Sequence, residues 1–247
     1  MPLSVIHAEA LYRSRPPVGY DDEGYPFEDS KVSESTKHDD VLTHFRVAAF
    51  TLVVDQRDTM VQRNLLILFE EGNPRAAVEP DVTVSLGVGR HPRNSYKLWV
   101  EGKPPDLAIE GLSERTWHRD VEVKPPLYRD LGVGEFWQLD PIGRTPDPIS
   151  GYRLSGGVYR PITPSPSGAY RSAVLNAEFS YDREEMHIVN LRTGRRVAPQ
   201  HETERQRDAA EHARDEEVRR RLSEGRAYEA RIAELEAKLR ARGARTN

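Results

Sequence analysis

Apolar residues recur at intervals of three and four between residues 36 and 55, and this spacing predicts an amphipathic helix. The repeating positions are Val41, Leu42, Phe45, Ala48, Ala49 and Leu52. Before this segment, residues 13–30 are crowded with Pro, Gly and acidic residues and show no apolar period, which predicts an irregular lead-in. Ordered structure is therefore expected to begin with the helix.

Short apolar runs after the helix predict β-strands. They cover residues 64–72, 80–88, 106–111 and 134–141. The sequence further predicts a hairpin over 151–162 and an edge strand with a turn over 186–197. Residues 106–111 are apolar almost without interruption, which is typical of a central strand buried on both faces.

A second helix is expected to start at Pro125 and Pro126, because the first turn of a helix tolerates the missing amides of proline. Gly132 would end it. The order of helix, strands, helix and strands predicts a mixed α/β or α+β domain, with helices flanking a central sheet.

From residue 201 onward the chain is rich in Glu, Arg and Ala and contains no Pro, which predicts a long solvated helix. Apolar residues follow a loose heptad spacing there, but Arg221 and Gly225 interrupt it. The heptad residues are Val218, Tyr228, Ile232, Leu235 and Leu239. Two alternatives stay open: a helix that is dispensable for folding of the domain, or a short coiled coil that pairs the chain into a homodimer.

Composition narrows the function classes. The 247 residues contain no run of about 18 apolar residues and no charged start followed by an apolar core, so we expect no membrane span and a cytoplasmic protein. The net charge of −4 disfavours a uniformly basic surface but allows a local basic groove. Because cysteine is absent, a metal site would use oxygen and imidazole ligands, which favours hard cations.

Acidic residues inside apolar strands are the candidate chemistry. A buried carboxylate costs several kcal/mol unless it is paired, protonated or bound to a metal, and Glu110 lies within a predicted central strand. Asp81 lies at the start of the strand over 80–88. If the two strands are neighbours, these carboxylates converge at one edge, roughly 3 to 6 Å apart. With Lys124, they could hold a divalent cation and orient a water molecule.

A structural alternative uses the same residues. Lys124 and Glu110 could form a buried ion pair that only fixes the position of the strand. Asp106, directly after Pro105, is expected to fix the start of the strand and to take no part in chemistry.

The stretch YKLWVEGKPPDLAIEGLSERTWHRDVEVKPPLYRDLGVGEFWQLDP, residues 96–141, resembles the Uma2 family of restriction-endonuclease-like proteins. The sequence keeps the family positions Pro80, Asp81, Pro105, Asp106, Glu110, Ser113, Thr116, Asp120, Lys124, Tyr128, Gly132, Val133, Glu135, Asp140 and Pro141. Glu34, Ser35 and His38 match the start of the family pattern. The resemblance implies a lead-in over 1–24, a PD-(D/E)xK nuclease-like domain over 25–200, and a helical tail over 201–247.

The resemblance also implies roles. Asp81 and Glu110 would be the two acids of the PD-(D/E)xK motif and the ligands of Mg²⁺ or Mn²⁺, and Glu34 would complete the metal shell. Leu112 stands where the motif usually has lysine, so Lys124 would be the displaced catalytic lysine. Two departures from the family, Gly111 in place of a branched residue and the prolines after Lys124, could loosen the strand or redirect the lysine.

Two functions follow from the resemblance. The first is a magnesium-dependent endonuclease that hydrolyses phosphodiester bonds of DNA. The second is a nuclease-fold module that binds nucleic acid or protein without cutting.

Overall fold

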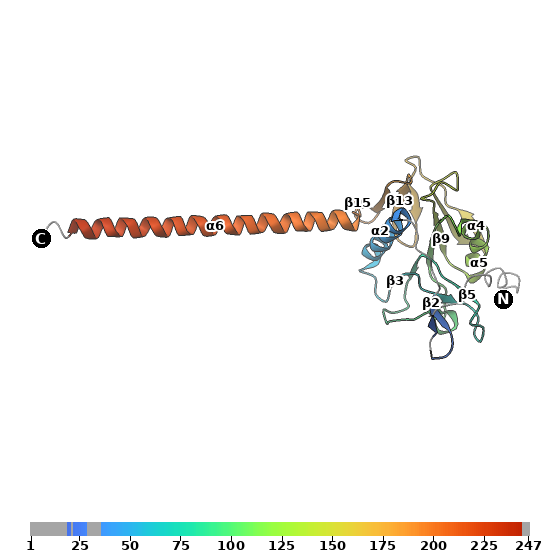
Figure 1. Cartoon of the computed structure of the whole chain (residues 1–247). Coiled ribbons are helices and arrows are strands. Elements are labelled where there is room, and N and C mark those ends of the chain that lie inside the picture. The colour runs from blue at the N-terminus through green and yellow to red at the C-terminus, as the bar shows by residue number, and fades with distance from the viewer. Residues whose placement is uncertain (1–18, 21, 29–35, 244–247) are drawn as a thin grey trace. The chain divides into compact units, whose positions relative to one another are not determined.

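The chain divides into two compact units, residues 1–198 and 199–247, which are considered separately. The computed structural model describes residues 19–20, 22–28 and 36–243 (Figure 1). Within that part of the chain, every strand belongs to the first unit. The second unit contains one helix, α6 (Gln200–Gly243), which starts one residue before the predicted tail.

A six-stranded sheet forms the centre of the first unit, in the order β11-β10-β9-β8-β6-β3. Its strands are β3 (Met60–Arg63), β6 (Val82–Ser85), β8 (Leu107–Gly111), β9 (Glu135–Leu139), β10 (Ile149–Ser155) and β11 (Val158–Pro161). Strands β8 and β9 are parallel, whereas every other neighbouring pair is antiparallel. The sheet is therefore mixed, as predicted.

Smaller sheets lie beside the central one. A four-stranded antiparallel sheet consists of β12 (Tyr170–Ser172), β13 (Ala177–Tyr181), β14 (Met186–Asn190) and β15 (Arg195–Arg196). A three-stranded sheet, in the order β5-β4-β7, consists of β4 (Ile67–Leu68), β5 (Ala77–Val78) and β7 (Tyr96–Lys97).

Among the described residues of the first unit, four helices accompany these sheets: α2 (Thr36–Val53), α3 (Leu98–Glu101), α4 (Trp117–Glu122) and α5 (Lys124–Leu131). Helix α2 agrees with the predicted helix to within two residues at its end. Helix α5 carries its prolines in the first turn and ends at Gly132, whose φ of 88° is left-handed, as the sequence predicted. Helix α4 was missed because six residues are too few to show a helical period.

The middle strands of the central sheet, β6, β8 and β9, are buried on both faces. Leu107 and Ile109 of β8 pack in one hydrophobic cluster with α2 and the four-stranded sheet. Ala108, between them, packs in a second cluster with α5 and the three-stranded sheet. Successive side chains of a strand point to opposite faces, so this division confirms β8 as the two-sided central strand that its apolar sequence predicted.

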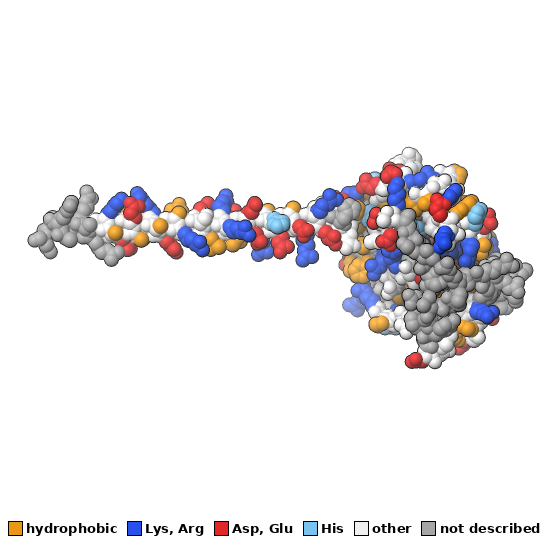
Figure 2. All heavy atoms as spheres, in the orientation of Figure 1, with side chains coloured by type: hydrophobic (Ala, Val, Ile, Leu, Met, Phe, Trp, Pro, Cys, Tyr) orange, Lys and Arg blue, Asp and Glu red, His pale blue; other side chains and the backbone are white. Residues whose placement is uncertain are grey.

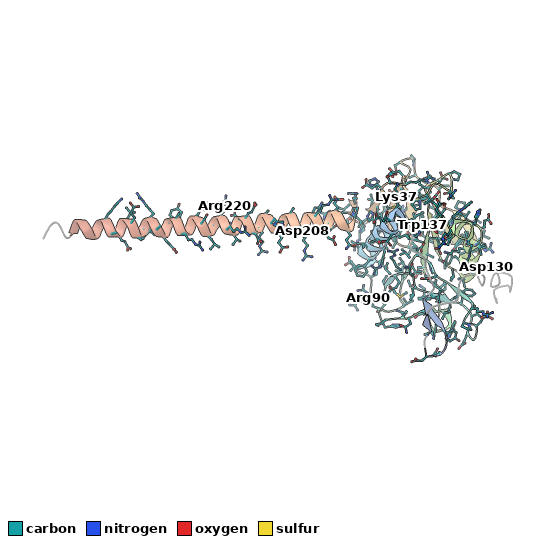
Figure 3. The ribbon with its side chains drawn as sticks, in the orientation of Figure 1. Lys37, Arg90, Asp130, Trp137, Asp208 and Arg220 are labelled. Carbon is teal, nitrogen blue, oxygen red and sulfur yellow. The ribbon has the colours of Figure 1, made fainter. Side chains whose placement is uncertain are left out.

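Trp137 of β9 lies in the interior of the first unit and is fully buried (Figure 3). Its ring packs edge-on against Phe179 at 5.1 Å and also covers Gly151 on β10, the residue paired with it. A Cβ atom at position 151 would overlap the indole ring, so the sheet needs glycine there.

Two predicted segments need correction. The lead-in is not wholly irregular, because β1 (Gly19–Tyr20) pairs with β2 (Pro26–Glu28) across a turn that contains Gly24 at a φ of 82°. The turn-forming residues between β1 and β2 allow these two short strands to pair. Residues 64–72 contain only β4, while the preceding strand β3 was missed because Gln62 and Arg63 conceal its apolar alternation.

Helix α6 is covered by charged side chains. Lys, Arg, Asp and Glu recur along the face visible in Figure 2, with apolar side chains between them. Val218, Tyr228, Ile232 and Leu235 are exposed, and the side chain of Leu239 lies outside the described residues. The coiled coil and the homodimer stay predictions. In the described part of the chain, no helix has the length and apolar character needed to cross a membrane.

Candidate active site

Asp81 and Glu110 lie at the same end of two neighbouring strands, β6 and β8, in the central sheet. Strand β6 runs antiparallel to β8, with Val82 paired to Ile109, and extending this register by one residue sets Asp81 opposite Glu110. Opposite residues on neighbouring strands project to the same face. The Asp81 carboxylate also accepts a hydrogen bond from the Gly111 amide at 2.8 Å. The predicted adjacency of the two strands is thus confirmed.

Both oxygens of the Glu110 carboxyl have partners. The Tyr128 hydroxyl donates to Oε1 at 2.5 Å, and the Lys124 Nζ lies 2.7 Å from Oε2. Only 1% of Glu110 is exposed. Burial raises the pKa of Glu110 to about 8; Lys124 opposes this rise, whereas the carboxylates of Asp81 and Asp120 add to it.

Lys124 projects from the start of α5 toward the sheet. Its Nζ lies between two carboxylates, 2.7 Å from Glu110 and 2.8 Å from Asp120. Burial lowers the pKa of Lys124, but Asp120 and Glu110 outweigh burial and hold the pKa above its usual value. Pro125 and Pro126 do not turn the amine away from Glu110.

Asp120 is a site residue to which the sequence assigned no role. Its Oδ2 accepts a hydrogen bond from the Thr116 hydroxyl at 2.6 Å, and Thr116 lies 2.9 Å from the Ser113 hydroxyl. Spacings of three, four and four from Ser113 through Thr116 and Asp120 to Lys124 are those of one helical face. This spacing was the signal that could have found Asp120 before the structure was known.

His38 of α2 closes the other side of the site. Its Nε2 lies 2.9 Å from the Gly111 carbonyl oxygen and 3.8 Å from the Asp81 carboxylate. A Cβ atom at position 111 would lie 2.6 Å from this nitrogen, so His38 occupies the space of a larger side chain. The departure from the family at Gly111 therefore has a packing reason.

We expect Gly111→Ala to lower the free energy of unfolding by about 1 to 3 kcal/mol, because the added methyl group must displace buried His38. Urea denaturation measures this loss. Gly225→Ala is the control, since the Cβ there meets nothing within 4 Å. In a His38→Ala background, the cost of Gly111→Ala should largely vanish. An equal cost in both backgrounds would contradict the packing explanation.

Asp106 fixes the start of β8, as predicted. Its Oδ2 accepts a hydrogen bond from the Leu86 amide at 2.7 Å, which ties the end of β6 to the start of β8. Its carboxylate also pairs with Lys103 at 2.7 Å. Glu34, the predicted third acid, lies outside the described residues.

The pKa of Glu110 predicts how stability depends on pH in metal-free protein. A folded-state pKa raised from 4.5 to about 8 means that the native state keeps a proton that the unfolded state releases. The stabilisation is complete below about pH 4.5 and is lost as the pH rises toward 8. We expect parent protein to lose a few kcal/mol relative to Glu110→Gln across this window.

Urea unfolding at several pH values between 5 and 9, in a chelator, measures this difference. Glu114→Gln, at an exposed glutamate of the same segment, is the control and should follow the parent. Parallel curves for the parent and Glu110→Gln would show that Glu110 does not titrate in this range.

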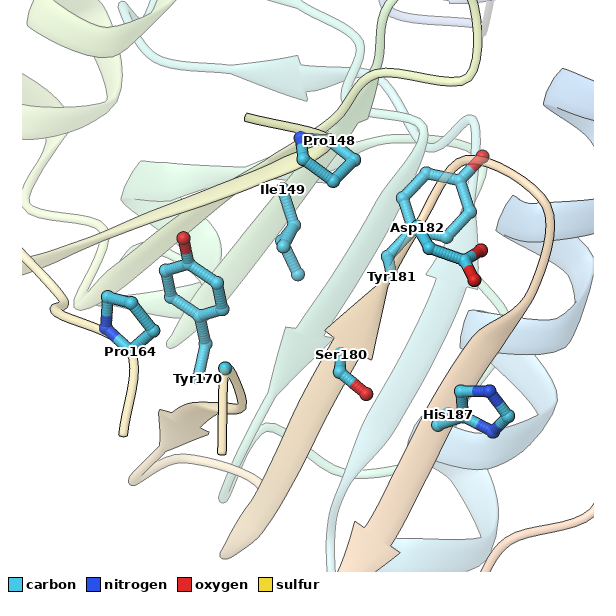
Figure 4. Close-up of a pocket in the computed structure, with 9 residues that line it drawn as sticks. Pro148, Ile149, Pro164, Tyr170, Ser180, Tyr181, Asp182 and His187 are labelled. Carbon is cyan, nitrogen blue, oxygen red and sulfur yellow. The ribbon is translucent and has the colours of Figure 1, made fainter. Parts of the chain in front are cut away.

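A cavity of about 260 Å³ lies elsewhere in the first unit, between β10 and the four-stranded sheet (Figure 4). Ile149, Tyr170, Tyr181 and His187 are among the residues that line it, and Asp81, Glu110 and Lys124 are not. The cavity and the carboxylate cluster are therefore separate places in the first unit.

The donor set of this cluster suits a hard divalent cation. Asp81, Glu110 and Asp120 face one ammonium group, so the cluster has a formal charge of −2 when all four groups are ionised. Among the described residues, no three acidic or imidazole side chains are grouped as metal ligands. Mg²⁺ needs fewer, because it is commonly held by one or two carboxylates and retains several water molecules. Asp81 and Glu110 are two such carboxylates, and Tyr128 and Lys124 occupy the two oxygens of Glu110 in this structure.

Comparison with known proteins shows which family the chain belongs to. Residues 23–183 match the family model of Uma2, described as "Putative restriction endonuclease". The chain belongs to the Uma2 family. This confirms the resemblance stated from the motifs, and the mixed sheet with flanking helices agrees with the predicted fold class.

Two further proteins are similar to this Uma2 member. One is UvrABC system protein B of Kosmotoga olearia, 26% identical over 129 residues, which are 51% of this chain and 19% of that protein. The chain thus matches only about a fifth of that relative's length. The other is the crystal structure of a "putative nuclease belonging to DUF820" from Anabaena variabilis, 18% identical with a TM-score of 0.42. That similarity covers 61% of this chain and 86% of the other.

Proposed function

We propose that this Uma2 protein is a metal-dependent endonuclease that hydrolyses phosphodiester bonds of DNA. The observation that carries the proposal is the meeting of Asp81, Glu110 and Lys124 at one sheet edge, from two strands and a helix. Membership of the Uma2 family, whose description reads "Putative restriction endonuclease", supports it.

Each residue has a role in this proposal. Asp81 and Glu110 supply carboxylate oxygens to Mg²⁺ or Mn²⁺, and Glu34 is proposed to add a third. When bound, such a cation polarises a phosphoryl oxygen and lowers the pKa of a bound water molecule. Lys124 places a fixed positive charge beside Glu110, where it stabilises negative charge that develops on the phosphate. Tyr128 orients the Glu110 carboxyl through its hydrogen bond.

A second candidate is a module of the same fold that binds nucleic acid or protein without cutting. The geometry of Lys124 favours it, because its ammonium is already paired with two carboxylates and its side chain is only 15% exposed. A closed ion-pair network of this kind needs no metal.

Nicking of supercoiled plasmid in Mg²⁺ or Mn²⁺ tests the two candidates. The parent protein should nick DNA, and nicking should stop when a chelator is added. Asp81→Ala combined with Glu110→Ala should lose at least about 10³-fold in rate, because the cation loses both ligands. Glu114→Ala combined with Asp147→Ala removes two exposed acids and should keep the parental rate.

A parent that neither nicks DNA nor binds Mg²⁺ in calorimetry would exclude the nuclease. DNA binding by that inactive parent, measured by fluorescence anisotropy, would then support the binding module.

A further inference from the structure

Lys124 is anchored from two directions. Glu110 approaches from the central strand β8 at 2.7 Å, and Asp120 approaches from α4, four residues earlier in the chain, at 2.8 Å. The amine therefore joins the helical segment to the edge of the sheet.

Asp120 is itself held by the surrounding structure. The Thr116 hydroxyl donates to its carboxylate at 2.6 Å, and the Gln138 side-chain amide donates to its backbone carbonyl at 2.5 Å. Gln138 lies on β9 and is the register partner of Glu110. Only 1% of Asp120 is exposed. Its position relative to Glu110 is thus set by contacts that do not involve Lys124.

The displaced lysine needs such an anchor. In the usual E-x-K arrangement, residues two apart on a strand point to the same face, so the strand itself directs the lysine. Here Leu112 holds that position and is fully buried. Lys124 instead reaches the site from a helix on a flexible four-carbon stem. Without Asp120, Glu110 alone would have to hold the Lys124 ammonium in place.

We propose that Asp120 is the positioning residue of Lys124. Asp120 keeps the Lys124 ammonium beside Glu110 when the Glu110 carboxylate also binds a second partner. The identity of that partner as a divalent cation rests on the proposed function, whereas the anchoring itself does not. Asp120 acts through Lys124 and has no direct contact with the reacting phosphate in this scheme.

Asp120→Asn tests the anchoring, because asparagine keeps the size of the side chain and an acceptor for Thr116 but removes the charge. Mass spectrometry follows acylation of Lys124 by an amine-reactive reagent in metal-free protein under native conditions. We expect several-fold faster acylation than in the parent, since the amine is released from one of its two carboxylates. Asp130→Asn, at a carboxylate paired with Arg129 on α5, is the control and should leave the rate unchanged.

Cleavage kinetics separate positioning from a merely structural role. With rates normalised to the folded fraction from circular dichroism, kcat of Asp120→Asn should fall about 10²-fold, while KM for DNA and the affinity for Mg²⁺ stay unchanged. A structural role would lower the folded fraction and leave the normalised kcat at the parental value.

Equal acylation of Lys124 in Asp120→Asn and the parent would overturn the proposal, as would an unchanged normalised kcat in an active enzyme. A parent that does not cut, combined with faster acylation in the variant, would remove the nuclease function and still support anchoring by Asp120. The two failures are therefore distinguishable.

Discussion

Lys124→Met should lower the free energy of unfolding by about 3 to 5 kcal/mol in metal-free buffer, because it leaves the buried carboxyl groups of Glu110 and Asp120 without their ammonium. Glu110 and Asp120 are each 1% exposed, so water cannot replace the lost charge. Urea denaturation in a chelator measures the loss. Lys103→Met is the matched control: Lys103 pairs with Asp106 in a more exposed setting, and its removal should cost about 1 kcal/mol or less.

The same variant should lose cleavage by about 10²- to 10³-fold, because Lys124 contributes charge to the reaction. Its affinity for Mg²⁺ should stay close to that of the parent, since lysine is not a metal ligand. Mg²⁺ should also restore part of the lost stability. Plasmid nicking and calorimetry check these results. Strong destabilisation without rescue by Mg²⁺, in a protein whose parent neither binds Mg²⁺ nor cuts, would leave Lys124 as a structural ion pair.

The main elements of the site could be predicted because their sequence signals are local. Glu110 stands out as an acid in a run of apolar residues, and the apolar period of α2 from Val41 to Leu52 extends over about three turns. The prolines and Gly132 mark both ends of α5. Asp81 follows from its place before a second apolar run. Each of these signals depends on a few residues close together in the sequence, so it can be recognised before the tertiary structure is known.

The remaining contacts depend on tertiary structure. Tyr128 reads as one more apolar residue of α5 until its hydroxyl is seen 2.5 Å from Glu110. Gly111 reads as a weakness in β8 until His38, 73 residues earlier, is found in the space beside it. Strands of two residues, such as β5 and β7, are too short to show any alternation. Their pairing is set by neighbours that are distant in sequence.

Glu135 illustrates a family position that we assign to folding. It begins β9 and is 1% exposed. Its carboxylate accepts hydrogen bonds from the Ser172 hydroxyl at 2.6 Å and the Ala173 amide at 2.8 Å, and it pairs with Arg153 at 2.9 Å. One side chain therefore ties the central sheet to the segment that leads from β12 into β13.

Glu135→Ala should lower the free energy of unfolding by about 2 to 4 kcal/mol, because it leaves the buried Ser172 hydroxyl and the Ala173 backbone amide without their acceptor. Glu135→Gln keeps one carbonyl acceptor and should cost less. Cleavage per folded molecule should stay at the parental rate in both variants. Glu135 pairs with Leu107, at the opposite end of β8 from Glu110, and three residues of strand separate the two sites by roughly 10 Å. Urea denaturation and plasmid nicking on the same samples give both quantities. A normalised cleavage rate that falls with Glu135→Gln would instead assign this carboxylate to the chemistry.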